Sequence, residues 1–582
     1  MTDEPKLASA EDEHALTPQE LRLIECAAKG EWWEPLEVDG KAPDMDPAKA
    51  NDWDMARTLR ADVIRCLAVG DVWSTQTQAW PISAKGILVS GAQISGVLDL
   101  EGVTVERLLC FQSCVFDGTV ELSDARTRAV SFDGSHLFRL TAERAKIDGG
   151  LYLRNGFAAK GEVRLRMADI KGQFSCSGGI FENPDGQALA ADSIRVGASL
   201  YLDHGFTAKG EVDLTGAKIT GQFSCENGRF EKQDGRALDA DTITVGGNVF
   251  LRHGFTAIGE VNFTRATIGG NLRGEGGSFD NATGDALDLS SVEIGAGLFL
   301  HALIPPEGCK NGMAGRLLLS QAKCRTYRDD QGSWPEPGKL VLDGFTYDRF
   351  AECDTDWRQR RLWLRRQNVD HIVDRYSPQP WTQAISVLRA MGHDREARRL
   401  AICRETVRLK SKSTGYWSKF WMALSYVTVG FGYRPWLALV WSALFVSVGW
   451  WMFASAASLG YMAPRDGAVR RSDEWNNPAK GHLLRPTLPR TYPPFNGLIY
   501  ALDGYLPVIE FGQDEAWEPS SVRTVPVIHS ALDWTEDAYV PKPPEWFFTK
   551  GVHRFVYWAN EILGWLFITL FVAGMSGLMK KE

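Results

Sequence analysis

The chain has 582 residues, enough for several domains that each bury a core. Apolar residues make up 44% and charged residues 24%, which is typical of folded protein and argues against a disordered chain. The formal net charge of −9 argues against a nucleic-acid binder, because such a protein needs a basic face to neutralise phosphates. No nucleic-acid partner is therefore expected.

Residues 1–83 are expected to form an N-terminal helical cap. A first helix is predicted to begin after Thr17, with Pro18 at its first position and Glu20 completing a capping box, and to end at Gly30. A second helix is predicted over about residues 53–69. Together the two helices would cover the exposed strand edge at the end of a repeat domain.

A repeat of 49 residues dominates the next part of the chain. Its copies begin at Leu151, Leu200 and Val249, and a further copy opens at Leu298. Each copy holds two weaker half-copies, and such a half-copy has about the length of one coil of a parallel β-helix. Upstream, apolar residues recur every five positions, which is typical of a pentapeptide-like, square-sided solenoid. The sequence thus predicts a mainly β fold, with a parallel β-helix in residues 84–347 that has about ten coils between Ile87 and Leu319.

Some chemically reactive residues recur with this repeat. His204 and His253 occupy the place that Asn155 has in the first copy, and we expect all three to be turn residues at outer corners. Two coils separate the histidines by roughly 9–10 Å, too far for both to bind one zinc ion. Cys176 and Cys225 are expected to be buried ladder residues. No metal site and no cofactor are predicted.

Residues 348–433 are predicted to form a basic helical hairpin and a juxtamembrane region. Between Trp357 and Lys412 there are 14 Arg and Lys residues against 5 Asp and Glu residues. A solvated helix face explains such a run, but so does contact with anionic lipid headgroups, which we favour because an apolar span follows. The candidate lipid-contacting residues are Arg398, Arg399, Arg404, Arg408, Lys410 and Lys412.

Residues 434–582 are predicted to be a membrane domain. Transmembrane helices are expected at about 436–462 and 555–579, joined by an extracytoplasmic loop at 465–553. Basic residues flank the cytoplasmic ends in this topology, so the solenoid and the C-terminus are both expected in the cytoplasm. All cysteines precede the first span, which suits a reducing compartment.

An unusually apolar stretch, residues 494–517, lies within the predicted loop. It is either an interfacial helix followed by a turn at Pro507 or a re-entrant segment between the spans. Its carboxylates Asp503 and Glu510, with Glu561 in the second span, are the candidate functional groups, because charge at membrane depth is costly. The sequence Thr-Val-Gly-Phe-Gly at 428–432 is similar to a potassium-channel filter, but it precedes the first span and is predicted to be a turn.

Several stretches point to a family: "YSPQPWTQAISVLRAMGHDREARR", "TVGFGYRPW", "YALDGYLPVIEFGQDEAW" and "GWLFITLFVAGMSGL". With the solenoid, they resemble bacterial membrane-associated, pentapeptide-repeat-like proteins, some of which bear the label "membrane-associated oxidoreductase". The resemblance covers residues 17–579 and implies a location in the bacterial plasma (inner) membrane. It assigns no catalytic residue, and the chain has no dinucleotide-binding glycine motif and no Cys-x-x-Cys pair.

Three functions are therefore weighed. The favoured one is a membrane-anchored scaffold without a catalytic site, which binds a cytoplasmic protein partner and anionic lipid headgroups. An oligomeric ion channel or transporter that uses Asp503, Glu510 and Glu561 is the first alternative, and it would require a homo-oligomer. A membrane-associated oxidoreductase is the second.

Overall fold

A computed structural model describes residues 15–36, 43–73, 78–351, 355–368, 372, 374, 376–472, 475, 491–506, 508–524 and 543–576. The chain forms two compact units, Met1–Arg404 and Glu405–Glu582.

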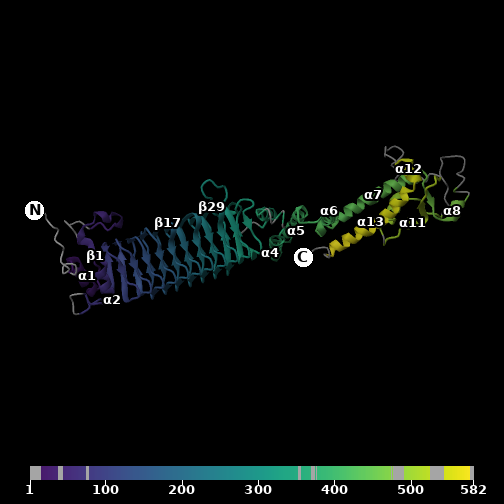
Figure 1. Ribbon diagram of the computed structural model, residues 1–582. Helices are drawn as coiled ribbons and strands as arrows, with labels where there is room; N and C mark the ends of the chain where they lie inside the picture. Colours follow the sequence, from purple (N-terminus) through teal and green to yellow (C-terminus); the bar gives the residue numbers. More distant parts are fainter. Residues whose placement is uncertain are drawn as a thin grey trace. The chain divides into compact units, whose positions relative to one another are not determined.

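A parallel β-solenoid of about 11 turns makes up most of the first unit. Figure 1 shows its strands as stacked rungs coloured from purple to teal. Each strand pairs in parallel with the equivalent strand one turn away; in one such step Leu200 lies opposite Phe223, and Phe223 lies opposite Val249. The predicted mainly β, parallel solenoid is thus confirmed, with about 11 turns against the ten estimated.

Each repeated coil has four short sides. In the coil that begins at Asp169 these sides are β15 (Asp169–Ile170), β16 (Phe174–Ser175) and the two ends of β17 (Ile180–Ala190). The register of β17 against the next coil breaks after Glu182 and resumes at Gln187, so the strand has an irregularity between these two residues.

The remaining strands belong to two sets of rungs. One set comprises β2 (Ile87–Ser90), β5 (Thr104–Gln112), β8 (Arg126–Ser131), β11 (Lys146–Ile147), β12 (Leu151–Tyr152), β18 (Arg195–Val196), β19 (Leu200–Tyr201), β21 (Lys218–Ile219), β22 (Phe223–Ser224), β24 (Thr244–Val245), β25 (Val249–Phe250), β27 (Thr267–Ile268), β28 (Leu272–Arg273), β30 (Glu293–Ile294), β31 (Gly297–Leu300), β33 (Lys323–Asp329) and β35 (Thr346–Phe350). The other comprises β1 (Thr58–Arg60), β3 (Gln93–Ser95), β4 (Leu98–Asp99), β6 (Val115–Phe116), β7 (Val120–Glu121), β9 (His136–Leu137), β10 (Leu140–Thr141), β13 (Ala158–Ala159), β14 (Val163–Arg164), β20 (Thr207–Asp213), β23 (Arg229–Asp239), β26 (Thr256–Asn262), β29 (Ser278–Asp288), β32 (Met313–Leu318) and β34 (Leu340–Val341).

A ladder of phenylalanine rings fills one corner of the solenoid core. Successive rings have centroids 5.2 to 5.4 Å apart, close to the rung spacing of about 4.8 Å. The members are Phe157, Phe181, Phe206, Phe230, Phe255 and Phe279, all fully buried. Cys176 and Cys225 are also fully buried, as predicted.

The recurring polar residues sit at outer corners. Asn155, His204 and His253 have φ values of 56°, 51° and 50°, which is the left-handed conformation of a tight turn. The side chain of His204 is 76% exposed. The prediction that these are turn residues is confirmed.

The N-terminal cap differs in part from the prediction. The helix α1 (Pro18–Lys29) has the predicted capping box at Thr17 and Glu20 and ends at Gly30. The prediction of one helix over 53–69 is wrong in its first half. That stretch holds the 3₁₀ turn η2 (Met55–Arg57) and strand β1, and only α2 (Ala61–Val69) is helical. The reason is tertiary: β1 pairs with β3 and so adds a rung to the end of the solenoid.

Other elements of the cap are the 3₁₀ helix η1 (Pro47–Asp52) and an isolated bridge between Trp33 and Val89.

Helices follow the last coils of the solenoid. After η3 (Gln331–Ser333) come α3 (Trp357–Leu364), α4 (Gln379–Ala390) and α5 (Asp394–Lys410). The side chains of Gln379 and Gln383 on α4 donate hydrogen bonds to the carbonyl oxygens of Phe345 and Tyr347 at 3.0 and 2.6 Å. Helices α4 and α5 thus lie in the stretch where the helical hairpin is predicted, and α4 covers the final rung β35.

The second unit contains two helices that are long and apolar enough to cross a membrane, α7 (Trp436–Ser458) and α13 (Val552–Met575). Its other elements are α6 (Tyr416–Val429), η5 (Gly430–Gly432), β36 (Met462–Pro464), α8 (Gly467–Arg471), α10 (Gly497–Asp503), α11 (Gln513–Ala516), β37 (Trp517–Pro519) and α12 (Glu545–Thr549).

The boundaries in this unit refine the predictions. The first apolar helix ends at Ser458, four residues before its predicted limit, because Gly460 turns the chain into β36. The second begins at Val552, and the predicted loop at 465–553 falls partly outside the described residues. Helix α6 was not predicted. The sequence at 428–432 ends α6 and turns into α7, with positive φ at Gly430 and Phe431, which confirms the turn.

Candidate functional site

An in-register column of outward side chains runs along one side of the solenoid. The parallel pairings align one residue from each of successive rungs, between inward-facing residues such as Leu151 and Leu200, which are fully buried. We call the aligned set the ring column; it consists of Ser131, Tyr152, Ser175, Tyr201, Ser224, Phe250, Arg273, Phe299 and Arg328.

Aromatic rings occupy alternate rungs of this column. Rungs stack about 4.8 Å apart, so the four rings follow one another at roughly 9–10 Å. The rings are half-buried, and the serines between them are buried. Arginine side chains lie over three rings: Arg154 over Tyr152, Arg252 over Phe250 and Arg273 over Phe299, with guanidinium carbons 4.5, 4.4 and 5.4 Å from the ring centroids.

The sequence reasoning did not single out this column. Its signal was the aromatic residue between two apolar residues in each 49-residue copy, as in Leu-Tyr-Leu at 151–153 and Val-Phe-Leu at 249–251.

In the second unit, residues 494–517 pack between α7 and α13. A Cβ atom at Gly449 of α7 would lie 3.4 Å from the Cβ of Ala501, and one at Gly564 of α13 would lie 1.8 Å from the carbonyl oxygen of Tyr505. The hydroxyl groups of Tyr505 and Ser442 are 2.9 Å apart. Gly564 lies midway along α13, so the segment reaches the middle of the helices. This packing places the segment against both apolar helices and leaves open which of the two alternatives holds.

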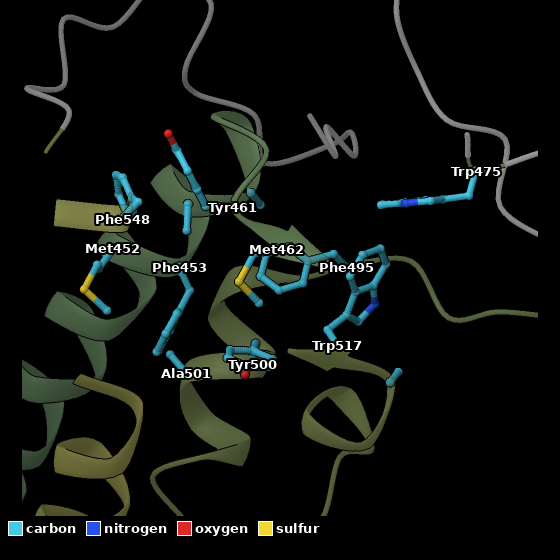
Figure 2. Packing of buried hydrophobic residues seen from close by; sticks show 13 residues of the cluster. Met452, Phe453, Tyr461, Met462, Trp475, Phe495, Tyr500, Ala501, Trp517 and Phe548 are labelled. Atoms are coloured by element: carbon cyan, nitrogen blue, oxygen red, sulfur yellow. The ribbon is translucent and has the colours of Figure 1, made fainter. Parts of the chain in front are cut away.

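An aromatic cluster joins this segment to the end of α7. Figure 2 shows Phe495, Tyr500 and Trp517 packed with Met452 and Phe453. The ring of Phe453 meets that of Tyr500 edge to face, with centroids 4.9 Å apart. The short antiparallel pair β36–β37 closes the cluster. This packing fixes the position of α10, at whose end Asp503 lies.

Asp503 is the last residue of α10 and is only 8% exposed. Its Oδ1 accepts a hydrogen bond from the N–H of Phe511 at 2.7 Å, and its Oδ2 accepts bonds from the N–H groups of Gln513 and Asp514 at 2.7 and 3.0 Å. Burial alone would raise the pKa of Asp503, but these donors outweigh it and lower the pKa. The carboxylate therefore holds the returning loop in place.

Asp514 lies against this group. Tyr557 of α13 donates a hydrogen bond from its hydroxyl to Asp514 Oδ2 at 3.3 Å. Burial, and next to it the neighbouring carboxylate of Asp503, raise the pKa of Asp514. The sequence reasoning did not single out Asp514, whose proximity to Asp503 depends on the loop closing back on α10.

The other two candidate carboxylates lie apart from this pair. Glu510 is exposed in the loop, and Glu561 is exposed on α13. Among the described residues neither side chain makes a hydrogen bond or an ion pair. The three carboxylates predicted to act together are thus not gathered into one site.

The candidate lipid-contacting residues are mostly solvent-facing. Five of them, Arg398, Arg399, Arg408, Lys410 and Lys412, are exposed. Arg404 is half-buried, and its Nη1 donates a hydrogen bond to Thr382 Oγ1 at 3.3 Å. Arg399 forms an ion pair with Glu396 at 3.7 Å, and Arg408 forms one with Glu405 at 3.6 Å.

A pocket of about 350 Å³ opens where α7 has ended and α13 begins. Two arginines, Arg465 and Arg554, lie on its wall. The other lining residues are Tyr500, Asp514, Trp517, Glu518, Pro519, Tyr557 and Trp558. The sequence reasoning did not single out Arg465 or Arg554 as candidate functional residues.

Two features of the described residues thus combine aromatic and arginine side chains at the surface: the ring column of the solenoid, and the pocket beside Arg465 and Arg554. Comparisons of the chain with protein-family models, with curated proteins and with solved structures find no significant match.

Proposed function

We propose that the chain is a membrane-anchored scaffold, whose solenoid binds protein partners through the ring column while α7 and α13 hold it at a membrane. The observation that carries the proposal is the even spacing of four half-buried rings on one side of a rigid solenoid. Aromatic and arginine side chains are the residues that contribute most to protein interfaces. Equal spacing lets one partner with a repeated surface, or several copies of a partner, bind side by side.

The anchor rests on the surface of the two apolar helices. Each exposes large apolar side chains, which a bilayer would cover: Trp436, Leu439, Val440 and Leu444 on α7, and Phe555, Ile562, Trp565 and Leu566 on α13. In the orientation that the flanking basic residues favour, the solenoid and both chain ends are cytoplasmic in a bacterial plasma membrane. The exposed basic residues of α5 then lie on the side of the anionic headgroups.

The carboxylates give less support to a pore. Asp503 accepts hydrogen bonds from three backbone N–H groups, and Glu510 and Glu561 are exposed. A group whose oxygens are already satisfied within its own loop is poorly placed to bind a passing ion.

The test is affinity purification of the full-length protein from its membrane, with quantification of the proteins that accompany it. The double variant Tyr201→Ser and Phe250→Ser removes two neighbouring rings of the column. We expect it to lose at least one partner that the unmodified protein retains, while the protein's amount and melting temperature change little.

The matched control is Phe138→Ser, which removes an exposed aromatic ring elsewhere on the solenoid. This variant should keep every partner. The scaffold proposal is wrong if the double variant retains the same partners as the unmodified protein in the same amounts.

A further inference from the structure

Two guanidinium groups converge on the pocket at the ends of α7 and α13. Arg465 follows β36, and its Nη1 donates a hydrogen bond to the carbonyl oxygen of Asp514 at 3.0 Å. Arg554 lies in the first turn of α13, and its Nε donates to the carbonyl oxygen of Pro519 at 3.0 Å. Each guanidinium group thus donates one hydrogen bond to a backbone carbonyl oxygen and keeps its other N–H donors.

Neither arginine is neutralised within the part of the chain that the structure describes. No ion pair involves Arg465 or Arg554 among the described residues. Two carboxylates share the pocket wall with them, and both are engaged elsewhere. Glu518 forms an ion pair with Arg470, and Asp514 accepts a hydrogen bond from Tyr557.

The wall of the pocket carries two arginines and two carboxylates, Asp514 and Glu518. Once Glu518 is matched by Arg470, two arginines face the single carboxylate of Asp514. A ligand of opposite charge would complete this arrangement.

We propose that this pocket binds a phosphate-bearing anion, held between the guanidinium groups of Arg465 and Arg554. The planar guanidinium group matches the oxygens of a phosphate and forms paired hydrogen bonds with them. The volume of about 350 Å³ is enough for a phosphate group with its glycerol or sugar neighbour.

The surroundings of the pocket favour a phospholipid headgroup over a soluble phosphate ester. The pocket lies where both apolar helices reach their ends, at the level that headgroups occupy if these helices cross a membrane. Trp558 on its rim is exposed, and indole rings are enriched at that level. A soluble phosphate would use the same two arginines, so the experiment must separate the two sources.

The experiment uses the purified full-length protein in an uncharged detergent. Its melting temperature is measured with added phosphatidylglycerol, with inorganic phosphate and with sodium chloride at equal ionic strength. Native mass spectrometry counts the phosphatidylglycerol molecules that each chain retains. The test variant is Arg465→Gln with Arg554→Gln, because glutamine can still donate to the two backbone carbonyl oxygens.

Arg471→Gln is the matched control. Arg471 is exposed on the same loop, donates to the carbonyl oxygen of Gly467 and does not line the pocket. If the double variant does not fold, the two single variants are compared in the same assays.

We expect phosphatidylglycerol to raise the melting temperature of the unmodified protein and of the control, and one retained lipid to be lost from the double variant. A rise with inorganic phosphate that the double variant loses would assign the pocket to a soluble phosphate ester. The proposal is overturned if neither ligand has an effect, or if the double variant responds as the unmodified protein does.

Discussion

Arg360 and Asp329 form a bidentate ion pair in which both side chains are only 1% exposed. Arg360 Nη2 donates to Asp329 Oδ1 at 2.8 Å, and Nη1 donates to Oδ2 at 3.0 Å. The indole N–H of Trp334 also donates to Oδ2, at 2.7 Å. Asp329 ends β33 and Arg360 lies on α3, so this pair fastens the first helix after the solenoid to its last coils.

Replacing Asp329 with Ala should destabilise the end of the solenoid. The change leaves the guanidinium group of Arg360 buried without a counter-charge, which costs about 3–5 kcal/mol. The measurement is hydrogen exchange of the amides of β33 and β35 in the full-length protein, where protection should fall.

The control is Lys323→Ala, which removes an exposed ion pair with Glu293 on the same face of the solenoid. Such pairs contribute about 0–1 kcal/mol, so protection should hardly change. Equal losses in the two variants would show that the buried pair has no special role.

At the other end, Glu20 makes the stability of the cap depend on pH. Its buried carboxylate accepts hydrogen bonds from the side chain of Arg60 and from the backbone N–H of Thr17. Burial alone would raise the pKa of Glu20, but the hydrogen bonds from Arg60 and Thr17 lower it below its ordinary value of 4.5. Because the folded pKa is the lower one, the stabilisation is complete above pH 4.5 and is lost as the pH falls through the folded pKa.

Hydrogen exchange of the α1 amides should show this as a loss of protection when the pH is lowered from above 4.5 to below the folded pKa of Glu20. Glu20→Gln should weaken protection at neutral pH and remove this pH dependence. Glu25→Gln is the control, since Glu25 is fully exposed beside Lys29 and should leave the profile unchanged. An unchanged profile for Glu20→Gln would contradict the assignment.

The features that were predictable from the sequence depend on local signals. Thr17, Pro18 and Gly30 define the first helix within a few neighbouring residues, and the recurrence from Leu151 to Leu200 defines the coils through their period. The two long apolar runs likewise gave α7 and α13 within a few residues.

The features that were missed depend on contacts distant in sequence. Strand β1 exists because Thr58 pairs with Gln93, which overrides the helical pattern of the surrounding residues. Asp503 was recognised as an unusual charge, but its partners at 511–514 appear only after the loop returns to α10. The aromatic residues of the ring column recur visibly in the sequence, but their alignment in one column follows only from the register between neighbouring strands.

Gly564 should be the least replaceable glycine of α13. A Cβ atom there would lie 1.8 Å from the carbonyl oxygen of Tyr505, and this backbone cannot rotate away. We therefore expect Gly564→Ala to separate the 494–517 segment from α13 and to lower the melting temperature in detergent.

Gly449→Ala is the matched comparison on α7, because its closest contact would be the side-chain Nδ2 of Asn560 at 2.5 Å. A side chain can adjust, so this variant should lose less stability. If Gly449→Ala is the more harmful change, the close approach at Tyr505 is not what holds the segment.

Asp503→Asn distinguishes a structural carboxylate from a pore carboxylate. The amide keeps one acceptor oxygen, which can stay with the N–H groups of Gln513 and Asp514, but turns the other position into a donor that then faces the N–H of Phe511. Two donors that face each other lose their hydrogen bonds, at a cost of about 1–3 kcal/mol. We expect a lower melting temperature and easier proteolysis near residue 511, with no change in ion flux through reconstituted vesicles.

Glu510→Gln and Glu561→Gln serve as controls within the same unit. Their carboxylates are exposed and make no hydrogen bond among the described residues. The free energy of unfolding of both variants should therefore lie within about 0.5 kcal/mol of that of the unmodified protein. The pore alternative would be favoured if the unmodified protein gave ion flux above background and any of these three variants abolished that flux. Asp503→Asn would then also have to leave the stability of the protein unchanged. Asp503 distinguishes the two alternatives best, because its three hydrogen bonds from backbone N–H groups account for its burial without any role in a pore.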